Sequence, residues 1–559
     1  MLNRRWLTAR RLLKSGEFKE LFVRSIKVFL DFISKETQID YLVWRERWVD
    51  LKEEEERRIV EEIDLLSENP SFKILLNADS VDPISLFSTI RSVKSQIYPN
   101  WMLEISNLHE LDSNVSREIF SMTDDRIAFS ESLEPSIEEW IIELDAGVSL
   151  HKTALADVAF SIVNDSEIQL VYGDHDHVDN SGIFLDPHMK PVWNAELFSA
   201  INYMAPFVIC EKGIWNDYRT INADQHDFLL EVTKNISSET IHHIPRILST
   251  VHITDKSSHL DPPIKKTPKT FRSPEPLVSV LIPTHNKGKI LEKCLESLFS
   301  LTDYSRFEVI LVDHETDENK ALKVIECFQD KENFNVVNFS GSFNFSAIMN
   351  RAAKAATGDI LVLLNNDTEI VEPEWLKEIV FRLSDPEIGI VGALLLFGDG
   401  TIQHAGIHPG VDGLMGHGHK HKSGDSSGYF NRLLAVHEVA AVTGACLAIE
   451  KPTWKALGGL DEKNLPVAYN DVDLCLKARE AGLKVILNPF VKVIHHESVS
   501  RGVDDDPKRN ERLNKELSIM KQRWKEKLNF DPAYSPNLNF VEGGFELAEK
   551  PRYIPRWKT

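Results

Sequence analysis

Apolar and polar positions alternate along the chain in blocks that are typical of strands and helices in succession. From residue 278 the apolar runs VSVLIP, FEVILVD, NVVNF and DILVLL are separated by stretches with helical spacing. These predict helices from Lys289, from Lys320 and over Ser346–Ala356, and a buried strand over Ile360–Leu364. A similar series begins at Phe72 with the run FKILLN, followed by a helical pattern over 83–96 and a strand pattern over 102–105. Near-continuous apolar strands joined by helices predict mostly parallel sheets covered by helices.

The two series resemble each other, which indicates a tandem duplication of one α/β unit. IRSVKSQIYPNWMLEI aligns with LESLFSLTDYSRFEVI, WIIELDAGVSL with ILVLLNNDTEI, and ADQHDFLLEV with YNDVDLCLKA, in the same order. A chain of 559 residues is also too long for one ordinary core. We predict an N-terminal helical segment (1–65), a first unit (66–255), a linker rich in Pro, Lys and Ser (256–276), a second unit (277–505), and a C-terminal helix and tail (506–559).

Composition narrows the class of protein. Hydrophobic residues make up 42% and charged residues 27% of the chain, as in soluble globular proteins. A formal net charge of -22 argues against a nucleic-acid binder, which needs a clustered cationic surface. The five cysteines are scattered without CxxC spacing, which favours a reducing cytoplasm. No long apolar run or secretory signal pattern is present, so we expect a cytoplasmic protein without a transmembrane helix.

Residues 1–14, MLNRRWLTARRLLK, carry five positive charges and no acid. Their apolar residues repeat at helical spacing. One interpretation is a peripheral helix attracted to anionic lipid at the inner face of the cytoplasmic membrane. The other is an amphipathic helix docked on its own protein.

Polar side chains follow several strands of the second predicted sheet. Thr284 and Asp313 come after the first two strands, and Asn365, Asn366 and Asp367 follow a later one. Ligands of open parallel sheets bind outside these carboxyl ends. Asp313 can accept from a nucleobase or ribose hydroxyl, or it is a loop acid. Asp367 can hold a hard divalent cation between phosphates, whereas Asn and Asp are also ordinary turn formers.

A second group of polar residues lies about a hundred positions later. Asp471 is at a predicted helix start, where it is either a general base or an N-cap, with Asp473 close by. His495 follows another strand as a candidate metal or phosphate ligand, or as a structural histidine, and Arg501 is suited to phosphate. The histidines of GLMGHGHKHK lack a carboxylate or cysteine partner at matching spacing, so we interpret this segment as a mobile acceptor-side loop rather than a metal site.

The stretch from about 278 to 502 resembles the family 2 glycosyltransferases of the GT-A fold, especially bacterial enzymes of O-antigen, capsule and rhamnan-type polysaccharide synthesis. The matching segments include VSVLIPTHN, FNFSAIMNRAAKAATGDILVLLNNDTEI, TIQHAGI, AVTGACLAI, GGLDEKNLPVAYNDVDLCLKAREAG and HHESVSRG. The resemblance implies two tandem GT-A-like, Rossmann-like domains. It also implies inverting transfer of a hexosyl or deoxyhexosyl group from a nucleoside-diphosphate sugar to a hydroxyl of a glycan acceptor, which we expect to be lipid-linked.

The resemblance also implies a role for each candidate residue. Asp471 would be the catalytic base, and Asp367 and His495 would hold Mg²⁺ or Mn²⁺. Donor binding would fall to Thr284, Asp313, Asn365, Asn366 and Arg501, and the acceptor side to His404, Asn470 and Asp473. The chain departs from the family pattern at Asp313-His314-Glu315-Thr316, where a D-N-G-S-like loop is usual, which leaves the nucleotide open.

The first unit carries the same resemblance but has lost the chemistry. Gly147 aligns with Asp367, Gln225 with Asp471, and the segment 249–251 lies near the His495 position. We therefore expect a degenerate, non-catalytic domain. The alternative is a rebuilt metal site at Asp174-His175-Asp176.

Two other functions remain open on the sequence. The first is a catalytically silent scaffold that binds glycans or nucleotides, as the first unit suggests. The second is nucleotidyl transfer on the same fold, which the base and acceptor segments disfavour. Retention of both Asp367 and Asp471 favours a transferase.

Overall fold

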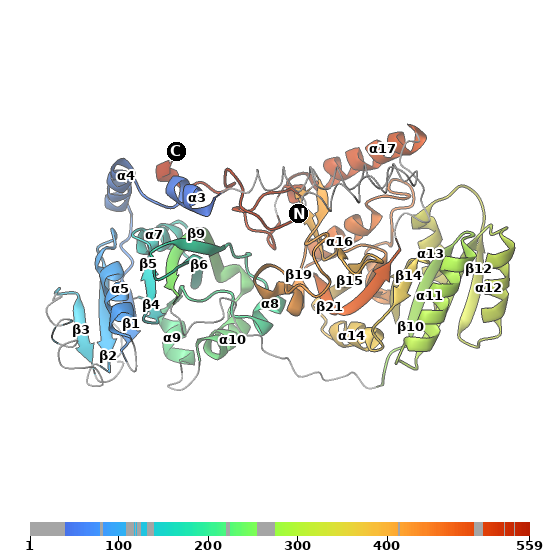
Figure 1. Ribbon diagram of the computed structural model, residues 1–559, viewed down its shortest axis with the longest axis horizontal. Coiled ribbons are helices and arrows are strands. Elements are labelled where there is room, and N and C mark those ends of the chain that lie inside the picture. Colours follow the sequence, from blue (N-terminus) through green and yellow to red (C-terminus); the bar gives the residue numbers. More distant parts are fainter. Residues whose placement is uncertain are drawn as a thin grey trace, which may run out of the picture.

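The protein consists of two α/β units arranged side by side (Figure 1). The computed structural model describes residues 40–78, 82–107, 117, 119, 124–130, 139–219, 224–253, 274–411, 414–496, 507–529, 531–541 and 543–558. Residues 1–14, Arg501 and most of the linker lie outside them. The C-terminal segment returns from the second unit to the first, so that the end of the chain lies beside α3 (Tyr41–Trp48) in Figure 1.

The second unit is built on a ten-stranded mixed sheet with the order β12-β11-β10-β13-β20-β15-β21-β14. The first four of these strands are parallel, β20 is antiparallel to both its neighbours, and β21 is parallel to β15. The strands are β10 (Val278–Thr284), β11 (Phe307–His314), β12 (Phe334–Phe339), β13 (Ile360–Leu364), β14 (Thr368–Ile370), β15 (Ile388–Leu396), β16 (Ile402–His404), β19 (His437–Glu438), β20 (Cys446–Glu450) and β21 (Lys484–His495), and β17 (Ile407–Pro409) pairs separately with β18 (Met415–His417).

The first unit repeats this arrangement in a nine-stranded sheet with the order β3-β2-β1-β4-β8-β6-β9-β5. Each position is filled by the equivalent strand, with the same parallel and antiparallel pairings. The strands are β1 (Phe72–Asn77), β2 (Trp101–Ser106), β3 (Ile127–Ser130), β4 (Trp140–Leu144), β5 (Val148–Leu150), β6 (Leu170–Val178), β7 (Phe184–His188), β8 (Val208–Glu211) and β9 (Ile241–His252). The predicted tandem α/β architecture is confirmed, although each sheet is mixed beyond its fourth strand.

Helices cover the sheets where the sequence predicts them. The predicted helices near Lys289, Lys320 and Ser346 are α11, α12 and α13, each shifted by one residue. The helices of the first half are α3, α4 (Glu53–Asp64), α5 (Pro83–Lys94), α7 (Ala154–Asn164), α8 (Ala195–Ala200), α9 (Lys212–Tyr218) and α10 (Gln225–Asn235). Those of the second half are α11 (Gly288–Leu301), α12 (Asn319–Gln329), α13 (Phe345–Ala355), α14 (Trp375–Arg382), α15 (Lys451–Ala456), α16 (Asn470–Glu480) and α17 (Pro507–Trp524).

Polar contacts of two asparagines, among others, join the units. Asn194 caps α8 by accepting from Leu197 N at 3.0 Å, and its side chain also exchanges hydrogen bonds with the backbone of Glu438 on β19. In the tail, Asn537 donates to the buried Asp174 of β6 at 3.0 Å. Because β19 pairs with β21, the first unit supports the strand that ends at His495.

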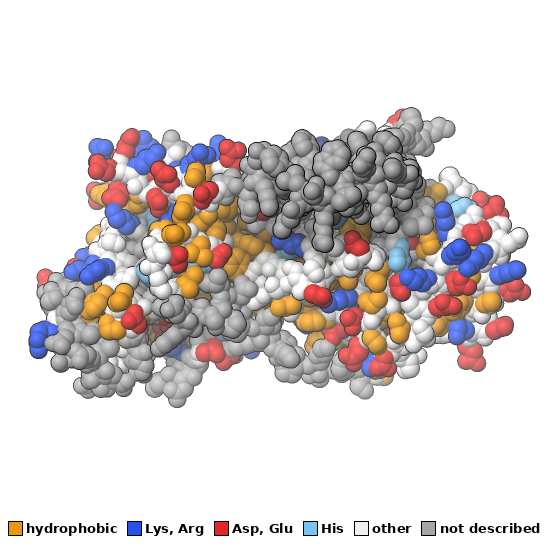
Figure 2. All heavy atoms as spheres, viewed as in Figure 1, with side chains coloured by type: hydrophobic (Ala, Val, Ile, Leu, Met, Phe, Trp, Pro, Cys, Tyr) orange, Lys and Arg blue, Asp and Glu red, His pale blue; other side chains and the backbone are white. Residues whose placement is uncertain are grey.

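The surface is mixed in charge. On the face in Figure 2, acidic and basic side chains are interspersed over both units, with apolar side chains between them. None of the described helices is long and apolar enough to cross a lipid bilayer.

Candidate active site

The turn after β13 brings polar side chains to the edge of the second sheet. All five residues of β13 are buried, and the chain then turns through Asn365, Asn366 and Asp367 before β14 begins. This turn is closed by Thr368 N and Oγ1, which both donate to Asn365 O. A buried apolar strand thus presents a carboxylate that is only 4% exposed.

The last residue of β21 faces this turn. Antiparallel pairing places His495 opposite Thr368, and His496 N donates to Asp367 O at 2.8 Å. His495 Nε2 lies 3.0 Å from Asp367 Oδ1. Its other ring nitrogen, Nδ1, lies 2.7 Å from Oε1 of Gln403, the middle residue of β16, which pairs with β15. Gln403 therefore fixes the orientation of the imidazole.

The donor set of this pair fits a divalent cation. Nδ1 donates its proton to the Gln403 oxygen, so a neutral His495 presents the Nε2 lone pair to the carboxylate. The amide nitrogen Nδ2 of Asn365 also lies 3.4 Å from His495 Nε2, and a proton or a cation can be shared between the imidazole and the carboxylate. Within the described ranges, no group of three or more His, Cys, Asp or Glu side chains is placed to hold a metal. A divalent cation that completes its coordination shell with phosphate and water needs few protein ligands, and one carboxylate oxygen and one imidazole nitrogen are available here as a pair.

Asp471 lies in the first turn of α16, on another wall of the site. Tyr469, two residues before Asp471, has a φ of 59°, which turns the chain sharply into the helix. Gly444 N donates to Asp471 Oδ2 and Val472 N to Oδ1, each at 2.8 Å. Both carboxylate oxygens thus have a backbone partner, and each keeps lone-pair capacity for a substrate proton.

These groups share one pocket of about 320 Å³. Of the residues predicted from sequence, the pocket is lined by Asn365, Asp367, His404, Asn470, Asp471 and His495. His417 and Lys420, which belong to the segment predicted as an acceptor-side loop, also line it, and so do Gln403, Gly444 and Tyr469, which the sequence analysis did not name as site residues. A hydrolytic or transfer reaction at this place would have a carboxylate pair, an oriented imidazole and one lysine available.

The second unit is similar in sequence to a known family. Residues 279–423 match the family model described as Glycosyl transferase family 2. This part of the chain is therefore similar to the family 2 glycosyltransferases. The match begins in β10 and includes the turn of Asp367.

Relatives extend the similarity to both units. Over 554 residues the chain is 32% identical to an uncharacterized protein, y4gI, of Sinorhizobium fredii. The alignment covers 89% of this chain and 60% of the relative. Over 536 residues it is 28% identical to the O-antigen biosynthesis protein RfbC of Myxococcus xanthus, covering 87% of this chain and 42% of the relative. The chain therefore spans less than two thirds of either relative. Among solved structures, GalNAc-T7 with UDP, GalNAc and Mn²⁺ is 18% identical with a TM-score of 0.38, covering 46% of this chain and 49% of that one.

Three predicted donor residues of the second unit lie outside the lining of the pocket. Asn366 Nδ2 donates to Thr284 Oγ1 at 3.1 Å, and the register of β10 and β11 sets Thr284 next to Asp313. Asp313 Oδ1 accepts from Thr316 N, as a loop acid does. The three residues share the carboxyl edge of the parallel strands.

Asp473 lies away from the pocket. Its carboxylate is buried and bonds to Arg523 Nη1 at 2.6 Å, to Lys477 Nζ at 2.7 Å and to Trp524 Nε1 at 3.1 Å. Side chains two residues apart on a helix point in different directions, which explains why Asp471 and Asp473 face different surroundings. We therefore do not retain Asp473 on the acceptor side.

The histidines of the 415–421 segment do not converge. His417 contacts His404, with 2.8 Å between their Nδ1 atoms. His419 stacks on Phe545 and His421 on Phe397. Burial, and then His417, lower the pKa of His404 well below its ordinary value, so His404 is neutral at pH 7.

The first unit has a different set of residues at the equivalent positions. Its turn between β4 and β5 ends at Gly147, whose carbonyl accepts from His252 N at 2.9 Å, as that of Asp367 does from His496 N. Val148 pairs with Val251, so a valine stands where the second unit has His495. Burial of His226, Phe228, Leu229 and Val232 on α10 repeats that of Val472, Leu474, Cys475 and Ala478 on α16, which equates Gln225 with Asp471.

The acids of the alternative first-unit metal site have protein partners. Asp176 accepts from Arg45 and Tyr41 at 2.5 Å and from Thr250 at 2.6 Å. Asp174 contacts His243 Nε2 at 2.8 Å and accepts from Asn537. Both carboxylates are 0% exposed, so they serve as internal ion-pair and hydrogen-bond centres of the first unit.

Proposed function

We propose that the second unit is an inverting glycosyltransferase that moves a sugar from a nucleoside-diphosphate donor to a hydroxyl of a glycan acceptor. The observation that carries this proposal is the shared pocket of Asp367, His495 and Asp471. It combines a cation-binding pair for a diphosphate with a separate carboxylate for a proton. The similarity to the family 2 glycosyltransferases supports the reaction class.

The donor is proposed to lie along the carboxyl edge of the parallel strands. Asp313 and Thr284 there would accept from and donate to the nucleoside, and Asn365 and Asn366 would contact the diphosphate. Asp367 and His495 would hold Mg²⁺ or Mn²⁺, which supplies positive charge to the departing diphosphate. Arg501, outside the described residues, is retained as a proposed phosphate contact.

Asp471 is proposed as the base. Its carboxylate takes the proton of the acceptor hydroxyl as that oxygen forms a bond to the anomeric carbon. The bond from this carbon to the diphosphate oxygen breaks on the opposite face, so one displacement inverts the configuration. The N–H groups of Gly444 and Val472 hold the carboxylate in one orientation before the acceptor arrives.

The acceptor is proposed to be a lipid-linked glycan of bacterial surface polysaccharide synthesis. The relative from Myxococcus xanthus is named as an O-antigen biosynthesis protein, which supports this substrate class. His404, His417 and Lys420 line the pocket and would contact the acceptor sugar. The cationic segment 1–14 would bring the enzyme to the inner face of the membrane, and the first unit would be non-catalytic.

The test is a thermal-shift panel of nucleoside diphosphates and nucleotide sugars with Mg²⁺, Mn²⁺ or a chelator. A ligand at about a hundred times its Kd stabilises a two-state unit by about 2.7 kcal/mol. We expect one nucleotide to raise the Tm only with metal, and Asp367→Ala to remove the shift. Transfer to a glycan should then be lost in Asp471→Asn while the shift remains. A chain that binds nucleotide but never turns it over would instead be a silent scaffold.

A further inference from the structure

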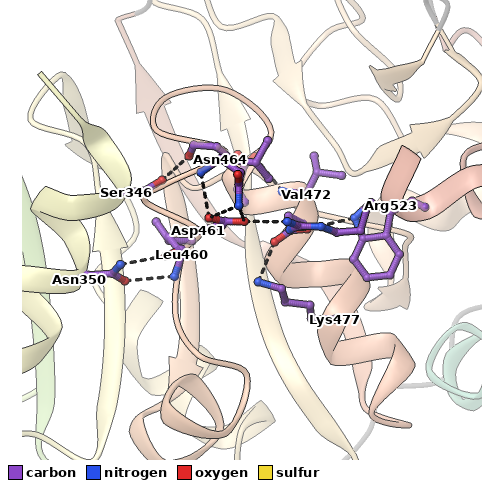
Figure 3. Close-up of polar contacts among 12 residues, drawn as sticks. Ser346, Asn350, Leu460, Asp461, Asn464, Val472, Lys477 and Arg523 are labelled. Atoms are coloured by element: carbon purple, nitrogen blue, oxygen red, sulfur yellow. Dashed lines mark hydrogen bonds and ion pairs between the residues drawn. The ribbon is translucent and has the colours of Figure 1, made fainter. Parts of the chain in front are cut away.

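The loop between α15 and α16 forms one wall of the pocket and leads directly into Asp471. Val467, Ala468 and Tyr469 of this loop line the pocket. Figure 3 shows the polar contacts that hold the loop, with α13 on one side and the helix that carries Arg523 on the other. The wall therefore depends on two helices that bracket it.

The contacts to α13 anchor the start and the middle of the loop. Asn350 receives a hydrogen bond from Leu460 N at 3.1 Å and donates to Leu460 O at 2.9 Å. Ser346 Oγ donates to Leu465 O at 2.6 Å. Because α13 packs in the core of the sheet, this side of the loop is fixed to the donor half of the domain.

The contacts to α17 anchor the end of the loop, next to the base. Glu516 is 1% exposed, and its two carboxylate oxygens accept from Val467 N at 3.0 Å and Ala468 N at 3.1 Å. Arg523 joins two other carboxylates, Asp461 at 2.7 Å and Asp473 at 2.6 Å. One helix thus binds the loop at two places and α16 at a third.

The backbone between these anchors is strained. Tyr469 has a φ of 59°, a left-handed conformation that is unfavourable for a side chain of this size. Such a residue persists only when its surroundings hold it. On one side it has the amides bound by Glu516, and on the other it has α16, whose Asp473 N donates to Tyr469 O at 2.9 Å.

We propose that α17 is a clamp that positions the acceptor-side wall and the base, with Glu516 and Arg523 as its positioning residues. This inference rests on the proposed function. Neither residue lines the pocket, so each acts through the loop or through Asp473. The apolar face of α17 fixes this helix against α16, because Met520 and Trp524 pack in the same core cluster as Val472 and Leu474.

The experiment compares Glu516→Gln with Glu511→Gln, an exposed glutamate on the same helix. Nucleotide-sugar turnover is measured with p-nitrophenyl glycosides as acceptor probes, and KM is determined separately for donor and acceptor. We expect Glu516→Gln to raise the acceptor KM or lower kcat by roughly ten- to a hundredfold, because small misplacements near the reacting atoms are costly. The donor KM and the metal-dependent nucleotide shift should stay within about twofold of wild type.

If Glu516 has a purely structural role, Glu516→Gln will have a lower Tm but unchanged kinetics of the folded protein. That result would overturn the clamp proposal and leave the proposed function standing. Should Glu516→Gln fail to fold, Arg523→Gln and Arg523→Lys provide the same test. Lysine keeps the charge but reaches only one of the two carboxylates, so it should restore part of the loss seen with glutamine. Equal kinetics for both would contradict the clamp. A wild-type chain that turns over no nucleotide sugar would overturn the proposed function and the clamp with it.

Discussion

The two units share a strand order and differ in what they place at the same edge of the sheet. Between β13 and β14 the second unit has Asn365-Asn366-Asp367, and between β4 and β5 the first has Asp145-Ala146-Gly147. The backbone hydrogen bond across this turn is the same in both, at 2.8 and 2.9 Å. The turn therefore belongs to the fold, whereas the carboxylate is present only in the unit for which we propose the function.

A similar contrast holds for the buried polar groups of the two units. In the second unit, Asp367 and Asp471 both line the pocket. In the first, Asp174 and Asp176 are enclosed and bonded to protein donors. The comparison teaches that buried carboxylates alone do not mark a catalytic site, because their partners decide their role.

The largest effect is expected at the proposed base. Asp471→Asn keeps the shape and an acceptor oxygen for one of the two backbone N–H groups, but it cannot take a proton, so transfer should fall by about a thousandfold or more. Its counterpart Gln225→Ala should leave the rate unchanged. Initial rates of glycan formation at saturating donor check both. Normal turnover by Asp471→Asn would remove the base assignment.

A smaller loss is expected at the imidazole. His495→Ala removes one of two proposed metal ligands, and the metal concentration for half-maximal activity should rise roughly ten- to a hundredfold. A metal titration of the transfer rate measures this change. Val251→Ala, at the equivalent place in the first unit, is the control and should give the wild-type curve. Identical curves for both variants would contradict a role of His495 at the metal.

The ion pair of the first unit should affect stability rather than rate. Arg45→Met leaves Asp176 buried without its guanidinium partner, so unfolding free energy should fall by about 3 kcal/mol. Denaturant titration measures the loss. If Arg45→Met lowered kcat per folded molecule as much as Asp471→Asn does, the first unit would take part in catalysis.

The smallest effect is expected where the units meet. Asn194→Ala removes the cap of α8 and its hydrogen bonds with Glu438, at a cost of about 1 kcal/mol. Differential scanning calorimetry measures the shift in Tm. A fall in Tm of many degrees would mean that the contact of Asn194 with Glu438, rather than the C-terminal tail, holds the two units together.

The sequence predicts most of the fold because local patterns decide it. The run Ile360–Leu364 is β13 with the expected bounds, and the expected α13 is displaced by one residue. The antiparallel β20 was not anticipated, since its place in the sheet depends on pairing with strands distant in sequence. For the site, Asp367, Asp471 and His495 were identified from motifs. Gln403 and Gly444 were not, because only tertiary pairing brings them to the imidazole and the carboxylate.

The central claim is that one unit of the two retains a nucleotide site. Isothermal titration of the full chain with the nucleoside diphosphate found by thermal shift, in the presence of Mn²⁺, tests it directly. The account predicts one binding site per chain, lost in Asp367→Ala and kept in Gln225→Ala. Two sites per chain, or one site that survives Asp367→Ala, would contradict it.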